Sequence, residues 1–363
     1  MAVLVVERDK VVKNINLLSQ LFSGSQIIGV VKGNGYGLGL LAFAKLLQEC
    51  GVYMFAVSRV EEAILLRQNG FTQEILNMTP VVSREDAAAL ISNNIIATIG
   101  SYENAVLLNG VAEEVGRICK AHIKIDTGFG RFGFFPAETE KVKSIVEFLR
   151  FVEIEGIFTH LHSAFGKEET VKAQYDKFIG VCDELRAQGV ALPIRHMANS
   201  CGALQFDFTR LDAVRIGSAF LGRLPIKNKW GLSKVGYLKA KVVDIKWMPK
   251  GSNIGYGQGY ATKDACRVGV VDVGYIDGFD MGKSKDVFRL RDVMRYVLHD
   301  LKGLFGNRRP WVTIGGKKIQ VIGRVAMCHT MVDVTKTEVQ TGDAVHIECN
   351  PLFVPESVER QYV

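Results

Sequence analysis

The amino-acid sequence predicts an α/β protein with an N-terminal (β/α)8 barrel of the TIM type and a C-terminal, mostly β domain. Over the first two thirds of the chain, short apolar runs alternate with longer segments of helical periodicity, as in parallel βα units. After about Trp230 the pattern changes to strands joined by glycine-containing turns. The chain has 363 residues, which is long enough for about two domains.

Eight apolar runs are the expected strands of the barrel. They are Gln26–Lys32, Val52–Val57, Glu74–Met78, Ile95–Ile99, Ala121–Asp126, Val152–Thr159, Ile194–Ala198 and Ala213–Ile216. Between most of them lie amphipathic segments, as in Val60–Gln68, Lys141–Leu149 and Ala173–Ala187. Eight such units within about 220 residues suit a barrel. A doubly wound sheet remains the alternative, because strand order cannot be read from sequence.

The second part of the chain has its own strand pattern. The predicted strands are Lys239–Trp247, Arg267–Val273, Trp311–Gly323 and Ala344–Glu348. We therefore expect a barrel domain over residues 1–228 and a β domain over residues 229–363. Apolar residues recur at helical spacing from Asp286 to Phe305, which predicts an inserted amphipathic helix near 286–305 that packs on the β domain.

Composition and charge exclude several classes of protein. The 45 basic and 38 acidic residues give a mild net charge of +7 without a basic stripe rich in aromatics, so nucleic acid is not an expected partner. The surplus is compatible with anionic ligands such as phosphates. Seven cysteines without a CxxC pair argue against a disulfide framework and a zinc knuckle, and no metal site is expected.

The same features predict where the protein works. Charged residues come too early in the chain for a signal peptide, and no run of about 18 uncharged apolar residues predicts a membrane span. Free thiols suit a reducing compartment. We therefore expect a cytoplasmic protein.

Polar residues follow the predicted strands at the end where barrel enzymes carry their active sites. Lys32, Asp126, His160, Asn199 and Arg215 each lie at the end of a different strand. A lysine that ends a buried apolar run is partly desolvated, which lowers its pKa and makes the amine nucleophilic toward an aldehyde. The alternative for Lys32 is an ordinary solvated surface charge.

Two further features of this rim are compatible with a phosphate. Four glycines in residues 33–39 let backbone amides approach a ligand closely, although a flexible βα turn explains them equally well. Ser200 and Ser218 follow the last two strands, where barrel enzymes often bind phosphate through N–H groups and small hydroxyls. Both serines could instead cap helices.

Eight motifs in a fixed order then identify a family resemblance. They are Val30–Gly37, Lys124–Gly133, Thr159–His160, Ala198–Ser200, Val214–Gly217, Gly255–Gly257, Gly274–Gly278 and Gly323–Met327. Over about residues 4 to 348 the chain resembles the alanine racemase family of pyridoxal-phosphate (PLP) enzymes. The lysine motif VVKGNGYG is the most specific of the eight.

The resemblance implies a catalytic role for four residues. Lys32 would hold PLP as a Schiff base and act as a base on one face of the substrate Cα, and Tyr256 would be the base on the other face. Two bases are needed because a racemase removes a proton from either side. His160 and Arg215 would assist Tyr256, and Arg215 would face the pyridine nitrogen, which a guanidinium leaves unprotonated.

The resemblance also implies how cofactor and substrate are held. The cofactor-binding residues would be Lys32, Tyr36, Asn199, Ser200, Arg215, Gly217 and Ser218. Arg131 would bind near the substrate carboxylate, with Lys124 beside it as a possible carbamylated lysine. Met327 and Tyr275 would line the substrate side, contributed together with Tyr256 by the second subunit of a homodimer.

Three departures from the family pattern lie near the expected mouth of the site or the dimer contact. Cys328 follows Met327 where the family usually has aspartate, and the end of the sequence at Val363 predicts that the family's final β segment, with its gating tyrosine, is missing. The predicted helix near 286–305 is longer than the usual connection. The chemistry close to the cofactor is intact, while the substrate pocket could differ.

The sequence therefore predicts PLP-dependent racemisation of a small amino acid, L-alanine to D-alanine first. Racemisation of serine or another, larger amino acid is the nearest alternative. A barrel-type PLP decarboxylase would need an acidic partner for the pyridine nitrogen, and Arg215 argues against it. A PLP carrier or regulator without turnover is disfavoured because it needs no second base such as Tyr256.

Overall fold

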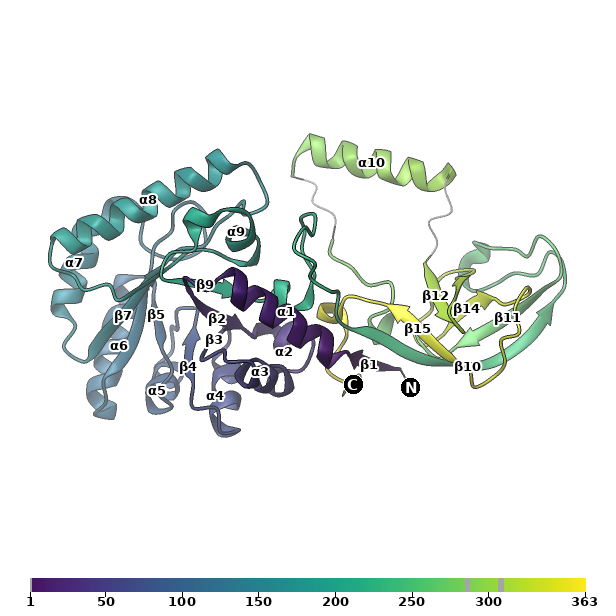
Figure 1. Ribbon diagram of the computed structural model, residues 1–363, viewed down its shortest axis with the longest axis horizontal. Helices are drawn as coiled ribbons and strands as arrows, with labels where there is room; N and C mark the ends of the chain where they lie inside the picture. Colours follow the sequence, from purple (N-terminus) through teal and green to yellow (C-terminus); the bar gives the residue numbers. More distant parts are fainter. Residues whose placement is uncertain (1, 285–287, 306–309) are drawn as a thin grey trace. The chain divides into compact units, whose positions relative to one another are not determined.

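Eight parallel strands form the sheet of the larger of two structural units (Figure 1). The computed structural model of the chain describes residues 2–284, 288–305 and 310–363, except for the side chains of 299 and 302–305. One unit comprises Arg8–Val235, and the other combines the N-terminal strand with Gly236–Val363.

The sheet of the larger unit closes into a barrel. Its strands are β2 (Gln26–Val30), β3 (Met54–Val57), β4 (Glu74–Asn77), β5 (Ala97–Ile99), β6 (Cys119–Lys124), β7 (Val152–Phe158), β8 (Ile194–His196) and β9 (Ala213–Ile216). They pair in the order β4-β3-β2-β9-β8-β7-β6-β5, and a parallel bridge between Leu76 and Ile96 joins the two ends. The predicted barrel is confirmed, and the doubly wound alternative is excluded.

One helix precedes the first strand of this barrel, and the others connect its successive strands. They are α1 (Arg8–Leu21), α2 (Lys32–Tyr36), α3 (Leu40–Glu49), α4 (Val60–Gln68), α5 (Arg84–Ser92), α6 (Tyr102–Val115), α7 (Thr139–Phe148), α8 (Glu168–Ala187) and α9 (Ser200–Gln205). Local sequence sets several of their ends. The Ser83 and Ser101 hydroxyls accept backbone N–H bonds at the starts of α5 and α6, and Gly116 ends α6 in the left-handed conformation.

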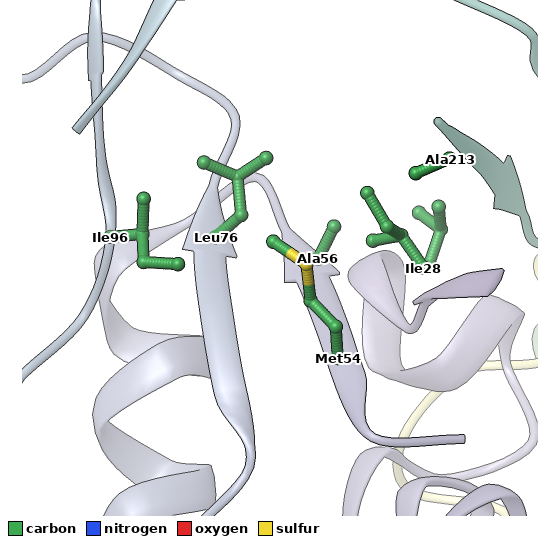
Figure 2. Packing of buried hydrophobic residues seen from close by; sticks show 7 residues of the cluster. Ile28, Met54, Ala56, Leu76, Ile96 and Ala213 are labelled. Atoms are coloured by element: carbon green, nitrogen blue, oxygen red, sulfur yellow. The ribbon is translucent and has the colours of Figure 1, made fainter. Parts of the chain in front are cut away.

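The interior of the barrel has an apolar part and a polar part. Figure 2 shows the apolar part, where buried side chains from β2, β3, β4 and β9 meet one from the residue before β5. These are Ile28, Val30, Met54, Ala56, Leu76, Ile96 and Ala213. Arg215 lies two residues after Ala213 and so on the same face of β9. Buried His122, Lys124 and His196 complete a polar part made by β6, β8 and β9.

The second unit is a mostly β structure. Its strands are β1 (Val3–Val6), β10 (Tyr237–Met248), β11 (Cys266–Val271), β12 (Trp311–Ile314), β13 (Lys317–Gln320), β14 (Thr330–Asp333), β15 (Ala344–Glu348) and β16 (Glu359–Tyr362). The run predicted as a single strand from Trp311 is a hairpin, because Gly315 and Gly316 turn the chain with φ of 54° and 77°.

The N-terminal strand belongs to this second unit rather than to the barrel. Strand β1 pairs antiparallel with β10 and parallel with β16, and the side chains of Leu4 and Val6 are fully buried. The division therefore differs from the expected 1–228 and 229–363. The main chain changes unit after Val235, and the first strand joins the C-terminal sheet because its apolar residues complete that core.

Helix α10 (Leu290–Phe305) is the inserted helix expected near 286–305. Asp286 and Val287, the first two residues of that expectation, lie outside the described residues. The apolar side chains of Leu290, Met294 and Leu298 are exposed. The expectation that the apolar stripe packs on the β domain is thus wrong for the side chains that the structure describes.

Two global findings bear on the expectations from composition. All seven cysteines are free. Among the described helices, not one combines the length and the apolar composition needed to cross a bilayer.

Candidate active site

Lys32 lies two residues beyond the end of β2, at the barrel rim. Its side chain is largely withdrawn from water, and this burial lowers the pKa of the amine. The positive charges of Arg131 and Arg215 lower that pKa further, while Glu62 opposes them. A larger share of the amine is therefore neutral and nucleophilic than for a solvated lysine, which contradicts the surface-charge alternative.

The glycine-rich segment after Lys32 is a left-handed turn with defined bonds. Gly33, Asn34, Gly35 and Tyr36 all have positive φ, between 53° and 64°. The Gly37 N–H closes the turn by donating to Gly33 O at 3.0 Å. The left-handed backbone conformation is unfavourable by about 1–2 kcal/mol for each residue other than glycine. Two glycines and an asparagine in the turn reduce this strain.

The bonds around Asn34 hold this turn in place. The Asn34 side-chain oxygen accepts from Leu40 N–H at 2.7 Å, and its backbone N–H donates to the Glu62 carboxylate at 3.1 Å. The turn sends the Tyr36 ring toward Gly217, where an added Cβ would lie 2.4 Å from the Tyr36 hydroxyl. Position 217 therefore needs glycine for room, and the reading of this loop as a flexible turn is not supported.

Backbone N–H groups and a serine hydroxyl lie next to this tyrosine. Ser200 Oγ accepts from Gly217 N–H at 3.1 Å and from Ala219 N–H at 3.3 Å. Asn199, not Ser200, caps α9, with bonds of 3.1 and 3.0 Å from Cys201 and Gly202. The alternative of Ser200 as a helix cap is thus excluded, because its hydroxyl joins the loops after β8 and β9.

Ser218 begins a short 3-10 helix (Ser218–Leu221), and no side-chain bond caps that helix. Gly217, the residue before Ser218, faces Tyr36 and bonds to Ser200. These four residues therefore lie together at one place on the rim. Hydroxyls and N–H groups in such a cluster suit an anion.

Arg215 is a buried guanidinium that donates in two directions. One nitrogen donates to His196 Nδ1 at 2.7 Å, and the other reaches His160 Nδ1 at 3.3 Å and Thr159 O at 2.7 Å. Burial, and then the charge of Arg131, lower the pKa of Arg215 to about 9, so it stays cationic at neutral pH. These bonds hold its plane within the barrel.

The donor character of Arg215 sets the tautomers of the histidines. A guanidinium cannot accept, so both Nδ1 atoms accept and each ring carries its hydrogen on Nε2. Burial and the charge of Arg215 keep the pKa of His160 and of His196 well below the usual value, so both rings are neutral. His196 Nε2 then donates to His122 Nδ1 at 2.8 Å, and His160 presents an N–H at its free edge.

Lys124 is the second desolvated lysine of the barrel. Its Nζ donates to Ile125 O at 2.8 Å and lies 5.5 Å from the centre of the Phe158 ring. Burial, and then the charge of Arg215, lower the pKa of Lys124 to about 7. A substantial fraction of this amine is therefore neutral at pH 7.

The loop that carries Arg131 is organised by Asp126. The two Asp126 carboxylate oxygens accept the backbone N–H groups of residues 128 to 131, at 2.9, 2.7, 2.8 and 3.0 Å. Burial alone would raise the pKa of Asp126, but these backbone bonds outweigh it and lower the pKa. The Arg131 guanidinium also lies over the rings of Phe129 and Phe132, at 4.6 and 4.8 Å.

Two residues with supporting roles, His122 and His196, were not predicted, and Asp126 was expected at the rim without a role. An aspartate two residues before a glycine-rich turn is a signal for side-chain capping of that turn, and it could have identified Asp126. The two histidines lie inside strands, where a single sequence does not distinguish them from ordinary core residues.

The remaining predicted residues lie in the β unit. Tyr256 begins a short 3-10 helix (Tyr256–Gln258) and is 74% exposed. Tyr275 and Met327 are brought together, because Tyr275 N–H donates to Ala326 O and Ile276 N–H donates to Met327 O, both at 3.1 Å. Both side chains are exposed.

The Tyr256 loop and the segment before Met327 pack against each other. An added Cβ on Gly323 would lie 2.7 Å from Ile254 O, and one on Gly255 would lie 3.6 Å from Arg324 N. Glycine at position 323 allows this close approach, whereas Gly255 adopts a φ of 76°, which favours glycine. The β unit thus presents Tyr256, Tyr275 and Met327 on neighbouring loops, while Lys32, Arg131, His160 and Arg215 belong to the barrel unit.

The barrel unit defines a class of protein: a (β/α)8 barrel with a desolvated lysine after its first strand and a cluster of hydroxyls and backbone N–H groups after its last two. Residues 6–225 match the family model of the alanine racemase N-terminal domain, and residues 235–352 match that of the C-terminal domain. The chain belongs to the alanine racemase family.

Relatives and solved structures agree with this membership. The chain is 34% identical over 350 residues to an alanine racemase of Clostridium tetani, covering 94% of this chain and 84% of that protein. It is also 34% identical over 331 residues to an alanine racemase of Methanococcus maripaludis, covering 89% and 82%. Alanine racemase of Clostridium difficile 630 has a similar structure, with a TM-score of 0.88 at 28% identity over 100% of this chain and 95% of that one.

One of the similar solved structures contains a bound ligand. The structure of alanine racemase from Bacillus anthracis with bound L-Ala-P matches at a TM-score of 0.84 and 26% identity, over 100% of this chain and 95% of that chain. The fold predicted from the sequence, and the resemblance on which the expected function depends, are both confirmed.

Proposed function

We propose that this protein is a PLP-dependent alanine racemase that interconverts L- and D-alanine. The observation that supports this most is the desolvated Lys32 at the barrel rim, in a chain that matches both family domains. The names of the relatives favour alanine over serine as the substrate. The buried cation Arg215 argues against a decarboxylase, which would need an acidic group in its place.

The residues of the rim fit PLP. A neutral lysine amine is what an aldehyde requires, and the cluster of Tyr36, Ser200, Gly217 and Ser218 suits a phosphate monoester. Arg215, which stays cationic, would lie at the pyridine nitrogen and leave that nitrogen unprotonated. When bound, PLP supplies an electron sink for the pair left behind as the Cα–H bond breaks.

Two of the chain's own side chains would move protons at Cα. Lys32 would take or return the proton on one face, and Tyr256 of a second copy of the chain would do so on the other. A phenol is a weak base with a pKa of about 10, so it needs a partner that favours its anion. The His160 Nε2–H is a suitable donor for that oxygen, because the Arg215 bond commits His160 Nδ1 to accepting.

Arg131 and Lys124 would act on the substrate carboxylate. Arg131 would bind the carboxylate from a loop that Asp126 holds in place. The neutral fraction of Lys124 can add CO2 and release one proton, which gives an anionic carbamate. That anion would offset the cations of Arg131 and Arg215, whose charges already lower the pKa of Lys124.

We further propose a homodimer that works in the cytoplasm. Tyr256, Tyr275 and Met327 are exposed on the β unit, as is expected of residues that complete a site on another subunit. A two-fold dimer makes the same contact twice and so builds two such sites. The seven free thiols suit a reducing compartment.

One experiment tests the activity and the cofactor together. The purified protein is incubated with PLP and a panel of L-amino acids that includes alanine and serine, and the enantiomers are then separated. D-alanine should form fastest, and Lys32→Ala should abolish its formation, while Lys318→Ala in β13 serves as a matched lysine control. Borohydride should fix the cofactor covalently on Lys32. A label on Lys124, or no label at all, would contradict the proposal.

A further inference from the structure

Helix α10 presents its apolar side to solvent. Leu290, Met294 and Leu298 are 79%, 51% and 54% exposed, and Val297 and Leu301 are exposed as well. At about 100° per residue these five positions fall within an arc of about 100°, which makes one continuous stripe. The stripe is therefore open to solvent.

The one buried side chain among those described in α10 belongs to its polar side. Asp292 is 6% exposed and pairs with Arg295 at 3.1 Å. A helix that packs on a protein core buries its apolar stripe and exposes its charges. In α10 the apolar stripe is exposed together with Arg291 and Arg295, which is typical of a helix whose apolar face has a partner outside the chain.

The segment that contains α10 holds most of the net charge of the chain. Residues 283–309 contain eight lysines and arginines against three aspartates, a net charge of +5 out of +7 for the whole protein. The individual basic residues are scattered along the sequence, but their excess over acidic residues is not. The partner of this segment is therefore expected to be anionic.

The basic side chains are placed beside the apolar stripe. On the helical wheel Arg291 and Arg295 follow directly after Leu298, at one edge of the stripe. Long basic side chains at such an edge can reach upward to anionic head groups while the stripe enters the apolar layer below. An amphipathic helix with low overall hydrophobicity, a basic edge and a leucine-rich face matches the pattern of helices that lie in the plane of a bilayer surface.

We propose that α10 binds the surface of a bilayer rich in anionic phospholipids, with its apolar stripe in the interface and Arg291 and Arg295 at the head groups. The contact attaches the enzyme to the membrane surface without crossing it. Stacking of two α10 helices from two copies is disfavoured, because it would bring together two segments that each carry +5. The inference does not depend on the racemase activity.

Co-sedimentation with vesicles tests the proposal. The full-length protein is mixed with vesicles of phosphatidylglycerol and phosphatidylcholine, or of phosphatidylcholine alone, at low and at high salt. It should sediment with the anionic vesicles and be released at high salt, because screening weakens the attraction. The double variant Arg291→Glu with Arg295→Glu should lower the affinity at least about 25-fold, since each basic residue contributes about fivefold.

Two further variants test the apolar contact. Leu298→Asp should lower the affinity at least about tenfold through loss of a buried leucine. Lys318→Glu and Val82→Asp change an exposed charge and an exposed apolar residue outside α10, and they should bind as the wild type does. Because Leu298 is exposed, its variant should fold, and its alanine racemisation in solution should be unchanged.

Three results would overturn the proposal. One is equal binding to anionic and to neutral vesicles. Another is loss of binding in Lys318→Glu as large as in the α10 variants. The third is an absence of vesicle binding together with a change of oligomeric state in Leu298→Asp, which would make α10 a contact between copies of the chain.

Discussion

Asp126→Asn separates the positioning of Arg131 from the stability of the barrel. The wild-type carboxylate accepts four backbone N–H bonds, of which the amide can keep two. The NH2 group of the asparagine then faces the backbone N–H groups of Gly130 and Arg131, which are also donors. A hydrogen bond to a charged group contributes about 1.5–3 kcal/mol. The lower value applies to each of the two lost bonds, because the loop is exposed to water. The total loss is therefore about 3 kcal/mol.

The free energy of the two lost hydrogen bonds sets an upper limit on the fall in kcat/KM. If all of it holds Arg131 in place, kcat/KM for alanine should fall by up to about a hundredfold. The change should appear mainly in KM, because the proposed role of Arg131 is to bind the substrate carboxylate. Racemisation is followed by chiral separation, and unfolding by denaturant titration.

Asp212→Asn is the matched control. Asp212 precedes β9, at the end of the barrel opposite the rim, and it accepts from Arg195 N–H at 2.8 Å. This variant should lose stability and keep its kcat/KM. If Asp126→Asn behaves in the same way, with lower stability and unchanged KM, the loop does not position a substrate-binding arginine and the reasoning fails.

The comparison of wild type with Asp126→Asn also predicts how the free energy of unfolding depends on pH. The folded-state pKa of Asp126 lies below its unfolded value, so its stabilising effect is complete above about pH 4 and is lost as the pH falls through the folded pKa. The difference in free energy of unfolding between wild type and Asp126→Asn should therefore be constant near neutral pH and shrink in acid. A difference that grows as the pH falls would contradict the assignment.

Four other outcomes are expected. Gly217→Ala should weaken PLP binding at least tenfold, measured by absorbance titration, because the new methyl group meets the Tyr36 hydroxyl at 2.4 Å; unchanged affinity would refute the close approach. Tyr256→Phe should still exchange the α-hydrogen of D-alanine with deuterium but lose exchange from L-alanine by about 10²–10⁴-fold; equal losses would mean that it is not a face-specific base. Lys32→Ala refolded together with Tyr256→Phe should regain about a quarter of wild-type activity by random pairing; no gain despite proven heterodimers would exclude shared sites. Labelled bicarbonate should give a carbamate NMR signal that Lys124→Met removes, and a signal that persists would place it elsewhere.

The sequence was a good guide to the elements of the barrel and a poor guide to their surroundings. Helix α4 has the predicted bounds, Val60–Gln68, because a clear apolar period lies between two buried strands. Strand β14 was missed, since four residues after an irregular loop give no period to detect. Strand β1 was not predicted, and its residues were expected in the barrel domain, because a short apolar run does not reveal which sheet it completes.

The site was predictable wherever a motif names a residue, and less so where a side chain acts through another. Lys32 and Arg215 lie at the rim as expected, whereas the bonds from Arg215 to His196 and on to His122 needed coordinates. For α10 the helical period was read correctly and its environment was not. Periodicity shows that a helix has an apolar face, and it does not show what covers that face.

The place of β1 has a consequence for biosynthesis. The strand is made first, but both of its neighbours, β10 and β16, are made later, and β16 emerges only at residues 359–362. At about 5–20 residues per second, β1 waits on the order of 20 to 70 s for its second neighbour. Meanwhile the barrel that follows it can fold as it leaves the ribosome. An apolar edge unpaired for that long is a target for chaperones, and a nascent chain stalled before β16 should be more prone to aggregate than the finished protein.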